Sequence, residues 1–351
     1  MNLFKPDFFS SKVSKPTPCN LKNLTPVQSL IDTHYKFIKI DNLEIFSLGG
    51  GIELNSSNLI VKDGNKKYLL KILDKIDSKD LISDQVSIVL FLQTHKVPVA
   101  KILEDNFGKY IIEKDDKYYY LMNYDSGVFY DGSGDLFHTT MLEIINLSNA
   151  LEKYDEKLFL KKGIDYSVDK IINSYEIASS QRKKWNLLFT DYEYLTKTWD
   201  EITKTIDKFS ANKSVIEGHK ISLCHIDLHP HNILTHNGKV SSILDYSSFE
   251  NSSRASALAF AFYKLSRQSI VKKIGIDPIV IKNDIFKAAE MLVKKKYFIS
   301  IEEITLHTKV ELIRRLFLIM MLNIKSDNQS WNFALKMQIN GLYEIDKILE
   351  K

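Results

Sequence analysis

Residues 223–246 constrain this chain more than any other part of its sequence. An apolar lead-in ends in a loop that holds Asp227, and an Asn237-Gly238 pair then separates two apolar runs. Asn-Gly supplies the positive φ angles of a tight two-residue turn, so the pair predicts a short β-hairpin. Such a hairpin returns Asn232 and Asp245 to the same open end, beside the loop that carries Asp227.

These three side chains suit phosphoryl transfer. Magnesium prefers hard oxygen ligands, and Asp245 offers a carboxylate while Asn232 offers an amide oxygen. Asp227 then stays free to orient an attacking hydroxyl and to accept its proton. We therefore expect Asn232 and Asp245 to bind Mg²⁺ and Asp227 to be the catalytic base.

The pattern His-x-Asp-x-x-x-x-Asn, followed by an apolar-apolar-Asp-aromatic strand end, resembles the catalytic loop of protein kinases. It is more similar still to that of the aminoglycoside phosphotransferase and choline kinase superfamily, which includes homoserine and sugar kinases. The resemblance implies ATP as phosphate donor and the same roles for Asp227, Asn232 and Asp245. His225 would brace the loop. His229 lies where protein kinases often place a phosphate-contacting lysine, so it is a nucleotide-binding candidate whose role stays open.

Two features in the first third of the chain fit a nucleotide site. Gly49, Gly50 and Gly51 interrupt two strand-like runs and resemble a glycine-rich cover over phosphates. They lack the spaced form of the protein-kinase motif, so a strand-connecting turn remains an alternative. Lys71 places a charge in an otherwise apolar strand, where burial is costly unless an anion such as ATP compensates it. An edge-strand lysine that reaches solvent is the alternative.

The superfamily pattern is incomplete after Lys71. A glutamate on the next helix usually pairs with this lysine, but the matching turn offers only Asp84 or Gln85, and Asp84 fits a solvated helix surface equally well. The strand end at Met122 and Asn123 resembles the hinge that contacts adenine, although a plain core strand fits nearly as well. Serines also replace the glycine that follows the metal-binding Asp in protein kinases, which argues against a protein substrate.

The order of elements gives the fold class. Three strands, one helix and two more strands fill the first third, with an Asp63-Gly64 turn joining the second and third strands. Helical periodicity dominates the rest, with stretches near 186–208, 255–267, 278–296, 304–323 and 331–349. With the resemblance, this predicts an α+β, protein-kinase-like, two-lobed fold with a small antiparallel sheet lobe holding one helix and a larger, mainly helical lobe. The expected division is an extension at 1–40, a nucleotide-binding lobe at 41–123, a linker at 124–134 and a catalytic and substrate-binding lobe at 135–351.

Composition narrows the function classes. The 351 residues are 44% apolar and carry a formal charge of +4 with scattered lysines, which gives no footprint for nucleic acid. Cys19 and Cys224 lack metal-type spacing and favour reduced thiols. The longest apolar run, 316–322, is too short to cross a bilayer, and the N-terminus has no signal-like apolar region. We expect a cytoplasmic protein without membrane or nucleic-acid partners; the oligomeric state stays open.

We therefore expect an ATP- and Mg²⁺-dependent kinase acting on a hydroxyl of a small molecule. Basic residues outnumber acidic ones in 255–351, which favours a neutral or zwitterionic alcohol such as an amino alcohol, homoserine or a sugar over a polycationic aminoglycoside. Alternatives are an aminoglycoside-modifying kinase and a weakly active regulatory pseudokinase. A zinc site is disfavoured because the histidines around Pro230 show no paired ligand spacing; they are His225, His229, His231 and His236.

Overall fold

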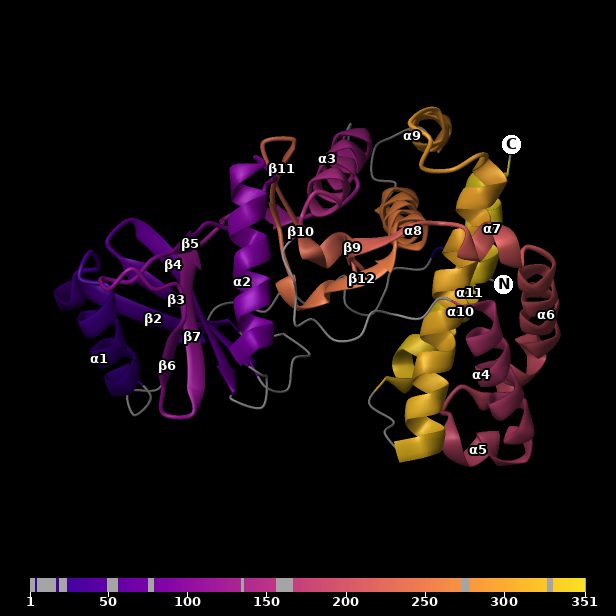
Figure 1. The fold of residues 1–351 in the computed structure, drawn as a ribbon, viewed down its shortest axis with the longest axis horizontal. Helices are drawn as coiled ribbons and strands as arrows, with labels where there is room; N and C mark the ends of the chain where they lie inside the picture. The colour runs from indigo at the N-terminus through magenta and orange to yellow at the C-terminus, as the bar shows by residue number, and fades with distance from the viewer. Residues whose placement is uncertain are drawn as a thin grey trace.

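A computed structural model describes residues 4, 17–18, 24–48, 56–74, 79–133, 136–155, 167–272, 278–326 and 331–350, and the structural statements below concern these residues. They form two lobes side by side (Figure 1), a sheet lobe in indigo and purple and a helical lobe that runs from magenta to yellow. The predicted α+β, two-lobed architecture is confirmed. No described helix is long and apolar enough to span a membrane.

One antiparallel sheet forms the frame of the sheet lobe. Its strands lie in the order β1-β2-β3-β4-β7-β5, and β6 also pairs with β7. Charged Lys71 thus sits in an interior strand between β3 and β7. The bounds are β1 Thr17–Pro18, β2 Leu43–Leu48, β3 Ser56–Asp63, β4 Lys66–Asp74, β5 Ile102–Leu103, β6 Ile112–Lys114 and β7 Lys117–Asn123.

Tight turns join neighbouring strands of this sheet. Asp63 pairs with Lys66 across the first hairpin, so Gly64 and Asn65 are its two turn residues, one position later than the expected Asp63-Gly64 turn. Gly64 takes φ 57°, which only a residue without a side chain adopts at little cost. The turn between β6 and β7 uses Asp115 and Asp116 at φ 51° and 56°; aspartate tolerates this left-handed region better than most residues.

Helices cover both faces of the sheet. α2 (Lys79–Thr94) lies between the sheet and the helical lobe and joins the large core that extends through both lobes. α1 (Leu24–His34) covers the other face, where Leu30, Ile31 and Tyr35 pack into a second, separate core with Val61 and other strand residues. No sequence pattern placed residues 1–40, and the structure makes part of this segment a cover for the sheet.

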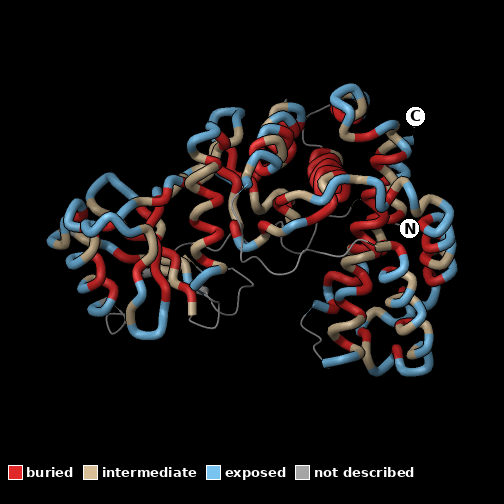
Figure 2. Tube along the Cα trace, viewed as in Figure 1, coloured by how far each residue is buried: buried red, intermediate tan, exposed pale blue. Residues whose placement is uncertain are grey.

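The helical lobe is a bundle around two long helices, α10 and α11, and the buried α8 (Figures 1 and 2). Its helices α8, α9, α10 and α11 start and end within five residues of the predicted stretches, and the predicted stretch 186–208 is broken into α5 and α6. The helices α4 and α7 were not predicted. The bounds are α3 Leu136–Leu151, α4 Val168–Ser180, α5 Trp185–Leu188, α6 Tyr192–Ala211, α7 Lys213–Glu217, α8 Arg254–Lys272, α9 Pro278–Lys294, α10 Ile301–Ser326 and α11 Asn332–Leu349.

Short strands carry the segment between the lobes. β9 (Ile221–His225) pairs with β12 (Phe249–Ser253), and β10 (Ile233–His236) pairs with β11 (Lys239–Ile243) and with β8 (Val128–Phe129) from the linker. Backbone contacts fasten this segment to the end of α2, because the Ile243 amide donates to the Pro98 carbonyl at 2.7 Å. The Ala100 amide donates to the Tyr246 hydroxyl at 2.8 Å. The chain around residue 245 therefore has a fixed position against the sheet lobe.

Candidate active site

The hairpin predicted around Asn237-Gly238 is confirmed. Asn237 and Gly238 take φ 50° and 74°, the positive values that a type I′ turn requires, and β10 and β11 flank them. At the open end, the Leu244 amide donates to the Asn232 carbonyl at 2.8 Å. Asn232 and the residue before Asp245 are therefore direct neighbours, as the register of the hairpin requires.

Asn232 is oriented by the loop that carries Asp227. It ends the short 3-10 helix Pro230–Asn232, and its side-chain Nδ2 donates to the Asp227 carbonyl at 2.9 Å. Because that bond uses the NH₂ group, it directs the amide oxygen Oδ1 elsewhere. The Asn232 side chain thus braces the loop through its NH₂ group, and its Oδ1 is a hard oxygen of the kind that suits Mg²⁺.

Asp245 is held by its own sequence neighbours. Its backbone is left-handed, at φ 61° and ψ 67°. Ser247 Oγ donates to its Oδ1 at 2.5 Å and Ser248 Oγ to its Oδ2 at 2.6 Å. Burial opposes ionisation, but His225, the two hydroxyls and Lys71 outweigh it, so the pKa of Asp245 lies below its ordinary value. Asp245 is therefore an ionised carboxylate with a fixed orientation.

Asp227 is held by a residue far away in the sequence. Arg315, on α10, donates from Nη1 to Asp227 Oδ1 at 2.9 Å and from Nη2 to the Ile226 carbonyl at 2.6 Å. Its Nε donates to Glu311 at 2.6 Å, and its guanidinium lies 3.9 Å from the Phe260 ring centroid. Arg315 therefore fixes the loop backbone and the carboxylate together. No motif in the sequence predicted this residue.

The Arg315 contact also controls the charge of Asp227. Burial alone would raise the pKa of this carboxyl, but the charges of Arg315 and then of His229 and His225 outweigh burial and lower the pKa to about 2. Asp227 is therefore ionised throughout the physiological range. Its side chain keeps 31% of its surface exposed, which leaves room for a hydroxyl to approach.

Two histidines complete the loop. His225 Nε2 lies 2.8 Å from the Leu244 carbonyl, and its Nδ1 accepts from the Asp227 amide at 3.3 Å, which is the bracing geometry expected of it. His229 Nε2 lies 3.5 Å from Asp227 Oδ2. Burial is the main cause that lowers the pKa of His229 to about 4, so the ring is neutral near pH 7. His229 can donate a hydrogen bond to a phosphate, but it does not replace the charge of a lysine.

The nucleotide side of the site comes from the sheet lobe. Lys71 is 9% exposed in an interior strand, so the alternative of an edge lysine in solvent is wrong. It is one of the charges that lower the pKa of Asp245, which places the two residues within electrostatic reach of each other. Asp84 and Gln85 on α2 are each 7% exposed, so the alternative of a solvated surface acid for Asp84 is also wrong.

The expected hinge is a buried strand end. Met122 is 4% exposed and pairs with Leu69 on one side and Ile102 on the other. The Asn123 amide donates to the Lys101 carbonyl at 2.9 Å, and the Tyr124 amide donates to the Lys67 carbonyl at 3.2 Å. Neither amide is available to a base without breaking these bonds. Gly49, Gly50 and Gly51 lie outside the described residues.

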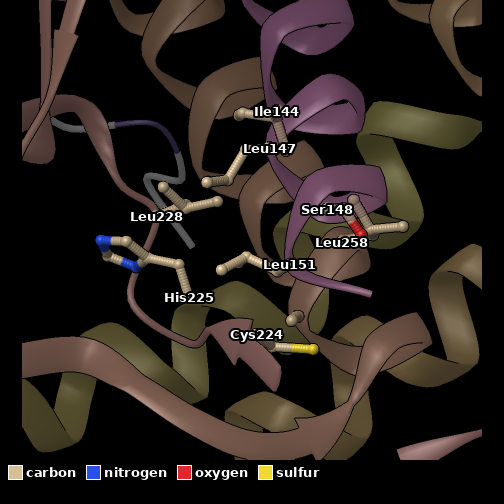
Figure 3. Close-up of a pocket in the computed structure, with 9 residues that line it drawn as sticks. Ile144, Leu147, Ser148, Leu151, Cys224, His225, Leu228 and Leu258 are labelled. Atoms are coloured by element: carbon tan, nitrogen blue, oxygen red, sulfur yellow. The ribbon is translucent and has the colours of Figure 1, made fainter. Parts of the chain in front are cut away.

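A small apolar cavity lies behind the catalytic loop (Figure 3). Its walls come from α3, α8 and the end of β9, which contributes Cys224 and His225, and the loop itself contributes Leu228. Cys224 lines it, and burial raises the pKa of this thiol to about 11, which confirms the residue as part of the core. The polar side chains of the lining already have protein partners: His225 Nε2 lies 2.8 Å from the Leu244 carbonyl, and Ser148 Oγ accepts from Arg254 Nε at 2.7 Å. The lining residues are Ile144, Leu147, Ser148, Leu151, Cys224, His225, Leu228, Ala257 and Leu258.

Comparison with solved structures confirms the fold as that of the aminoglycoside phosphotransferases and related small-molecule kinases. A spectinomycin phosphotransferase solved with ADP and spectinomycin aligns with TM-score 0.58 at 13% identity, covering 96% of this chain and 98% of that one. An amicoumacin kinase solved with AMP-PNP and Ca²⁺ gives 0.57 at 14% identity, with 93% of each chain covered. A Plasmodium vivax ethanolamine kinase gives 0.52 at 16% identity, with 93% and 89% covered.

Comparison by sequence gives nothing further. No family model matches this chain, and no curated protein matches it. At the low identities of the structural matches, the fold is shared while the side chains that decide the substrate are free to differ. The activity therefore has to be argued from the site.

Proposed function

We propose that this chain is an ATP- and Mg²⁺-dependent phosphotransferase that moves the γ-phosphate to a hydroxyl group of a small molecule. The supporting observation is the convergence of Asp227, Asn232 and Asp245, with Lys71 approaching from the other lobe. Phosphoryl transfer needs a metal-binding carboxylate, a second oxygen ligand, a cation for the phosphates and an acid that orients the nucleophile. These four side chains have those chemistries.

The donor set fits Mg²⁺. Asp245 supplies an ionised carboxylate, and the Nδ2 bond of Asn232 leaves its Oδ1 to act as the second ligand. An ion held by these two residues would supply positive charge to the phosphates of the nucleotide. Ser247 and Ser248 hold the Asp245 carboxylate in its orientation before the metal arrives, which lowers the ordering cost of binding.

Asp227 acts mainly by orienting the acceptor. A carboxylate with a pKa of about 2 is a weak base, but it always offers a charged acceptor for a hydrogen bond. In the loose transition state of phosphoryl transfer, little proton transfer precedes bond formation to phosphorus, so orientation matters more than basicity. His229 is placed to donate from Nε2 toward the same carboxylate or toward a transferring phosphate.

The nucleotide would lie between the lobes. Lys71 would contact its phosphates, and Asp84 or Gln85 on α2 would orient Lys71. Because the amides of Asn123 and Tyr124 already have carbonyl partners, adenine recognition by the backbone would fall to the chain from Asp125 onward. Met122, at the buried end of β7, would then lie beside the adenine ring.

The charges near Asp227 favour a neutral or zwitterionic acceptor. Arg315 contacts the carboxylate, and Lys264 is among the charges that lower its pKa. Like charges repel across a desolvated site, so an acceptor with several ammonium groups is disfavoured. Amino alcohols, homoserine-like alcohols and sugars fit better. Because the similar structures include kinases solved with antibiotics, spectinomycin and aminoglycosides belong in the same screen.

The test is a coupled ADP-release screen over these acceptors, with Mg²⁺ present or chelated by EDTA. We expect one acceptor class to give Mg²⁺-dependent release, and Asp227→Asn to lower its rate about 1,000-fold while retaining MgATP binding. Arg314→Met is a matched control, because Arg314 Nε and Nη2 donate to Glu311, which also accepts from Arg315 Nε. MgATP binding with a release rate that Asp227→Asn leaves unchanged would instead identify a nucleotide-binding pseudokinase.

A further inference from the structure

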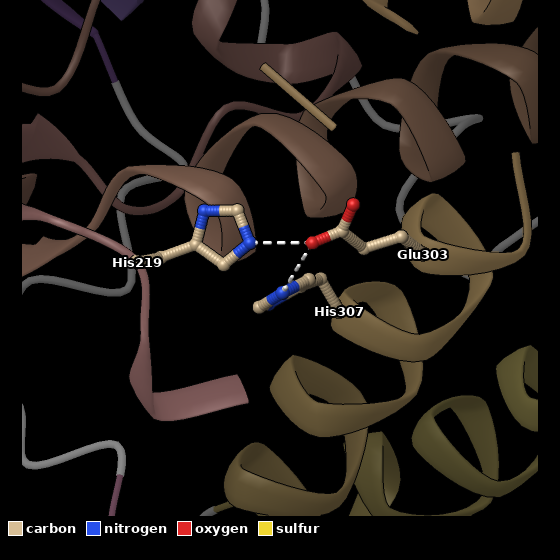
Figure 4. A group of neighbouring side chains, drawn as sticks. All are labelled: His219, Glu303 and His307. Atoms are coloured by element: carbon tan, nitrogen blue, oxygen red, sulfur yellow. Dashed lines mark hydrogen bonds and ion pairs between the residues drawn. The ribbon is translucent and has the colours of Figure 1, made fainter. Parts of the chain in front are cut away.

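A second group of ligand-type side chains lies outside the proposed active site (Figure 4). His219 precedes β9 in the short connection after α7, and Glu303 and His307 lie one turn apart at the start of α10. The spacing of four residues places Glu303 and His307 on the same face of that helix. Among the described residues, this is the group of histidines and acids whose ligand atoms all lie within 4.8 Å of one another.

The three ligand atoms point at a common centre. His219 Nε2 lies 2.6 Å from Glu303 Oε1, and His307 Nε2 lies 3.9 Å from the same oxygen. The rings of His219 and His307 meet edge to face, with centroids 4.5 Å apart. Two imidazole nitrogens and one carboxylate oxygen form the His₂Glu donor set that suits a dication of borderline softness, above all zinc.

An independent observation is the state of His307. This residue is 0% exposed, and its Nε2 is buried without a hydrogen-bond partner among the described residues. A buried nitrogen of this kind costs stability unless something binds it. Burial also lowers the pKa of His307 to about 3, so the ring is neutral and offers a lone pair. The ion pair between His219 and Glu303 does not give His307 Nε2 a hydrogen-bond partner among the described residues.

The surroundings fix the ligands as a metal site requires. Ser256 Oγ lies 3.2 Å from His307 Nδ1, so the other ring nitrogen is the one that faces Glu303. The second oxygen of Glu303 accepts from the Ile299 amide, which directs Oε1 toward the histidines. Outer contacts of this kind orient ligands in known metal centres. His219 keeps 23% of its side chain exposed, which gives an entry path from solvent.

We propose that His219, Glu303 and His307 form a binding site for one zinc-like dication, distinct from the magnesium site. Mg²⁺ and Ca²⁺ are excluded by their preference for oxygen donors. The ion would join the start of β9, which leads into the catalytic loop, to α10, which carries Arg315. Eight residues separate His307 from Arg315, about 12 Å along the helix, so the site would stabilise the packing of α10 and would not touch the reaction.

The test uses the full chain without a histidine tag, because a tag would itself bind zinc. After treatment with a chelator, the protein is dialysed against Zn²⁺, and bound metal is measured by elemental analysis and calorimetry. We expect one Zn²⁺ per wild-type chain, with affinity at least tenfold weaker in His219→Ala and in Glu303→Gln. Both variants spare the buried His307, and the amide of Glu303→Gln can still accept from the Ile299 amide.

Two controls keep this result separate from the proposed activity. Asp245→Asn removes the carboxylate of the magnesium site and should bind Zn²⁺ as the wild type does. His95→Ala removes an exposed histidine at the end of α2 and should also have no effect. Co²⁺ should give a visible absorption spectrum that His219→Ala loses. Wild-type protein without stoichiometric zinc, or variants with wild-type affinity, would overturn the proposal whether or not the chain proves to be a kinase.

Discussion

The two acidic residues of the site are built in different ways. Asp245 is oriented by Ser247 and Ser248, which follow it directly, so the metal-binding half is assembled from one short segment. Asp227 is oriented by Arg315, 88 residues further along the chain. The acceptor-orienting half of the site therefore depends directly on how α10 packs. The metal-binding half is linked to α10 only indirectly, through the Asn232 bond to the Asp227 carbonyl beside the Ile226 carbonyl that Arg315 holds. Variants at Asp227, Asp245, Arg315 and Ser248 test this difference.

Exchanging either acid for its amide should separate the two halves most strongly. Asp227→Asn removes the charge that orients the acceptor and should lower kcat about 1,000-fold with MgATP affinity retained. Asp245→Asn removes a metal ligand and should abolish Mg²⁺-dependent nucleotide binding itself. Calorimetric titration with MgATP, beside turnover on the identified acceptor, measures both. If both variants lose ATP affinity equally, the assignment of separate roles is wrong.

Removing Arg315 should affect the acceptor half alone. Without the guanidinium, Asp227 loses its fixed position, and a shift of this kind costs about 100-fold in kcat. MgATP affinity should stay near the wild-type value, because Asp245 keeps its serines. Arg315→Lys restores the charge without the forked geometry and should recover only part of the rate. A fall in ATP affinity in Arg315→Met that matches the fall in kcat would show that the halves are not independent.

The contact between Arg315 and Asp227 should also make the stability of the fold depend on pH. Because the folded pKa of Asp227 is depressed from 3.8 to about 2, the ionised form stabilises the fold above the ordinary value. That contribution, up to about 2 kcal/mol, is lost as pH falls from about 4 to 2. In Arg315→Met it should be largely absent, and the acid limb of kcat/KM should move to higher pH. Denaturant unfolding at pH 7 and at pH 3, beside the Arg314→Met control, measures the first effect.

The smallest effect is expected in the metal-binding half. Ser248→Ala removes one of two hydroxyls that hold Asp245, and the loss of one hydrogen bond corresponds to about 1 kcal/mol, or about fivefold weaker Mg²⁺ binding. The rate at saturating Mg²⁺ should hardly change. Ser210→Ala, which removes a hydroxyl bonded only to the Ile206 carbonyl on α6, is the control. An effect larger than that of Arg315→Met would reverse the comparison.

The sequence predicted the parts of the site that follow from local rules. Asn237 and Gly238, which both take positive φ, fix the register of the hairpin. That register places Asn232 beside Asp245 independently of the surrounding tertiary structure. The burial of Lys71 also followed from its apolar neighbours in one strand. The Asp63-Gly64 turn was expected one residue early, because either pair of residues satisfies the same turn chemistry and only strand pairing decides between them.

Other features had no local signal. The histidines around Pro230 are close in sequence, yet the metal-type group in the structure joins His219 to Glu303, 84 residues further along the chain, and to His307 one turn beyond it. The sequence of α1 contains no motif. It packs on the sheet because it covers an apolar sheet face that would otherwise be exposed to solvent.

The chain by itself thus determined its α+β class, the succession of strands along the chain apart from the short β1 and β5, and the hairpin that brings Asn232 beside Asp245, since these depend on backbone preferences within a few residues. The packing of α10 decided the rest. It brings Arg315 to Asp227 and Glu303 to His219, and contacts over such separations depend on which helix faces are buried together, for which no short sequence pattern exists.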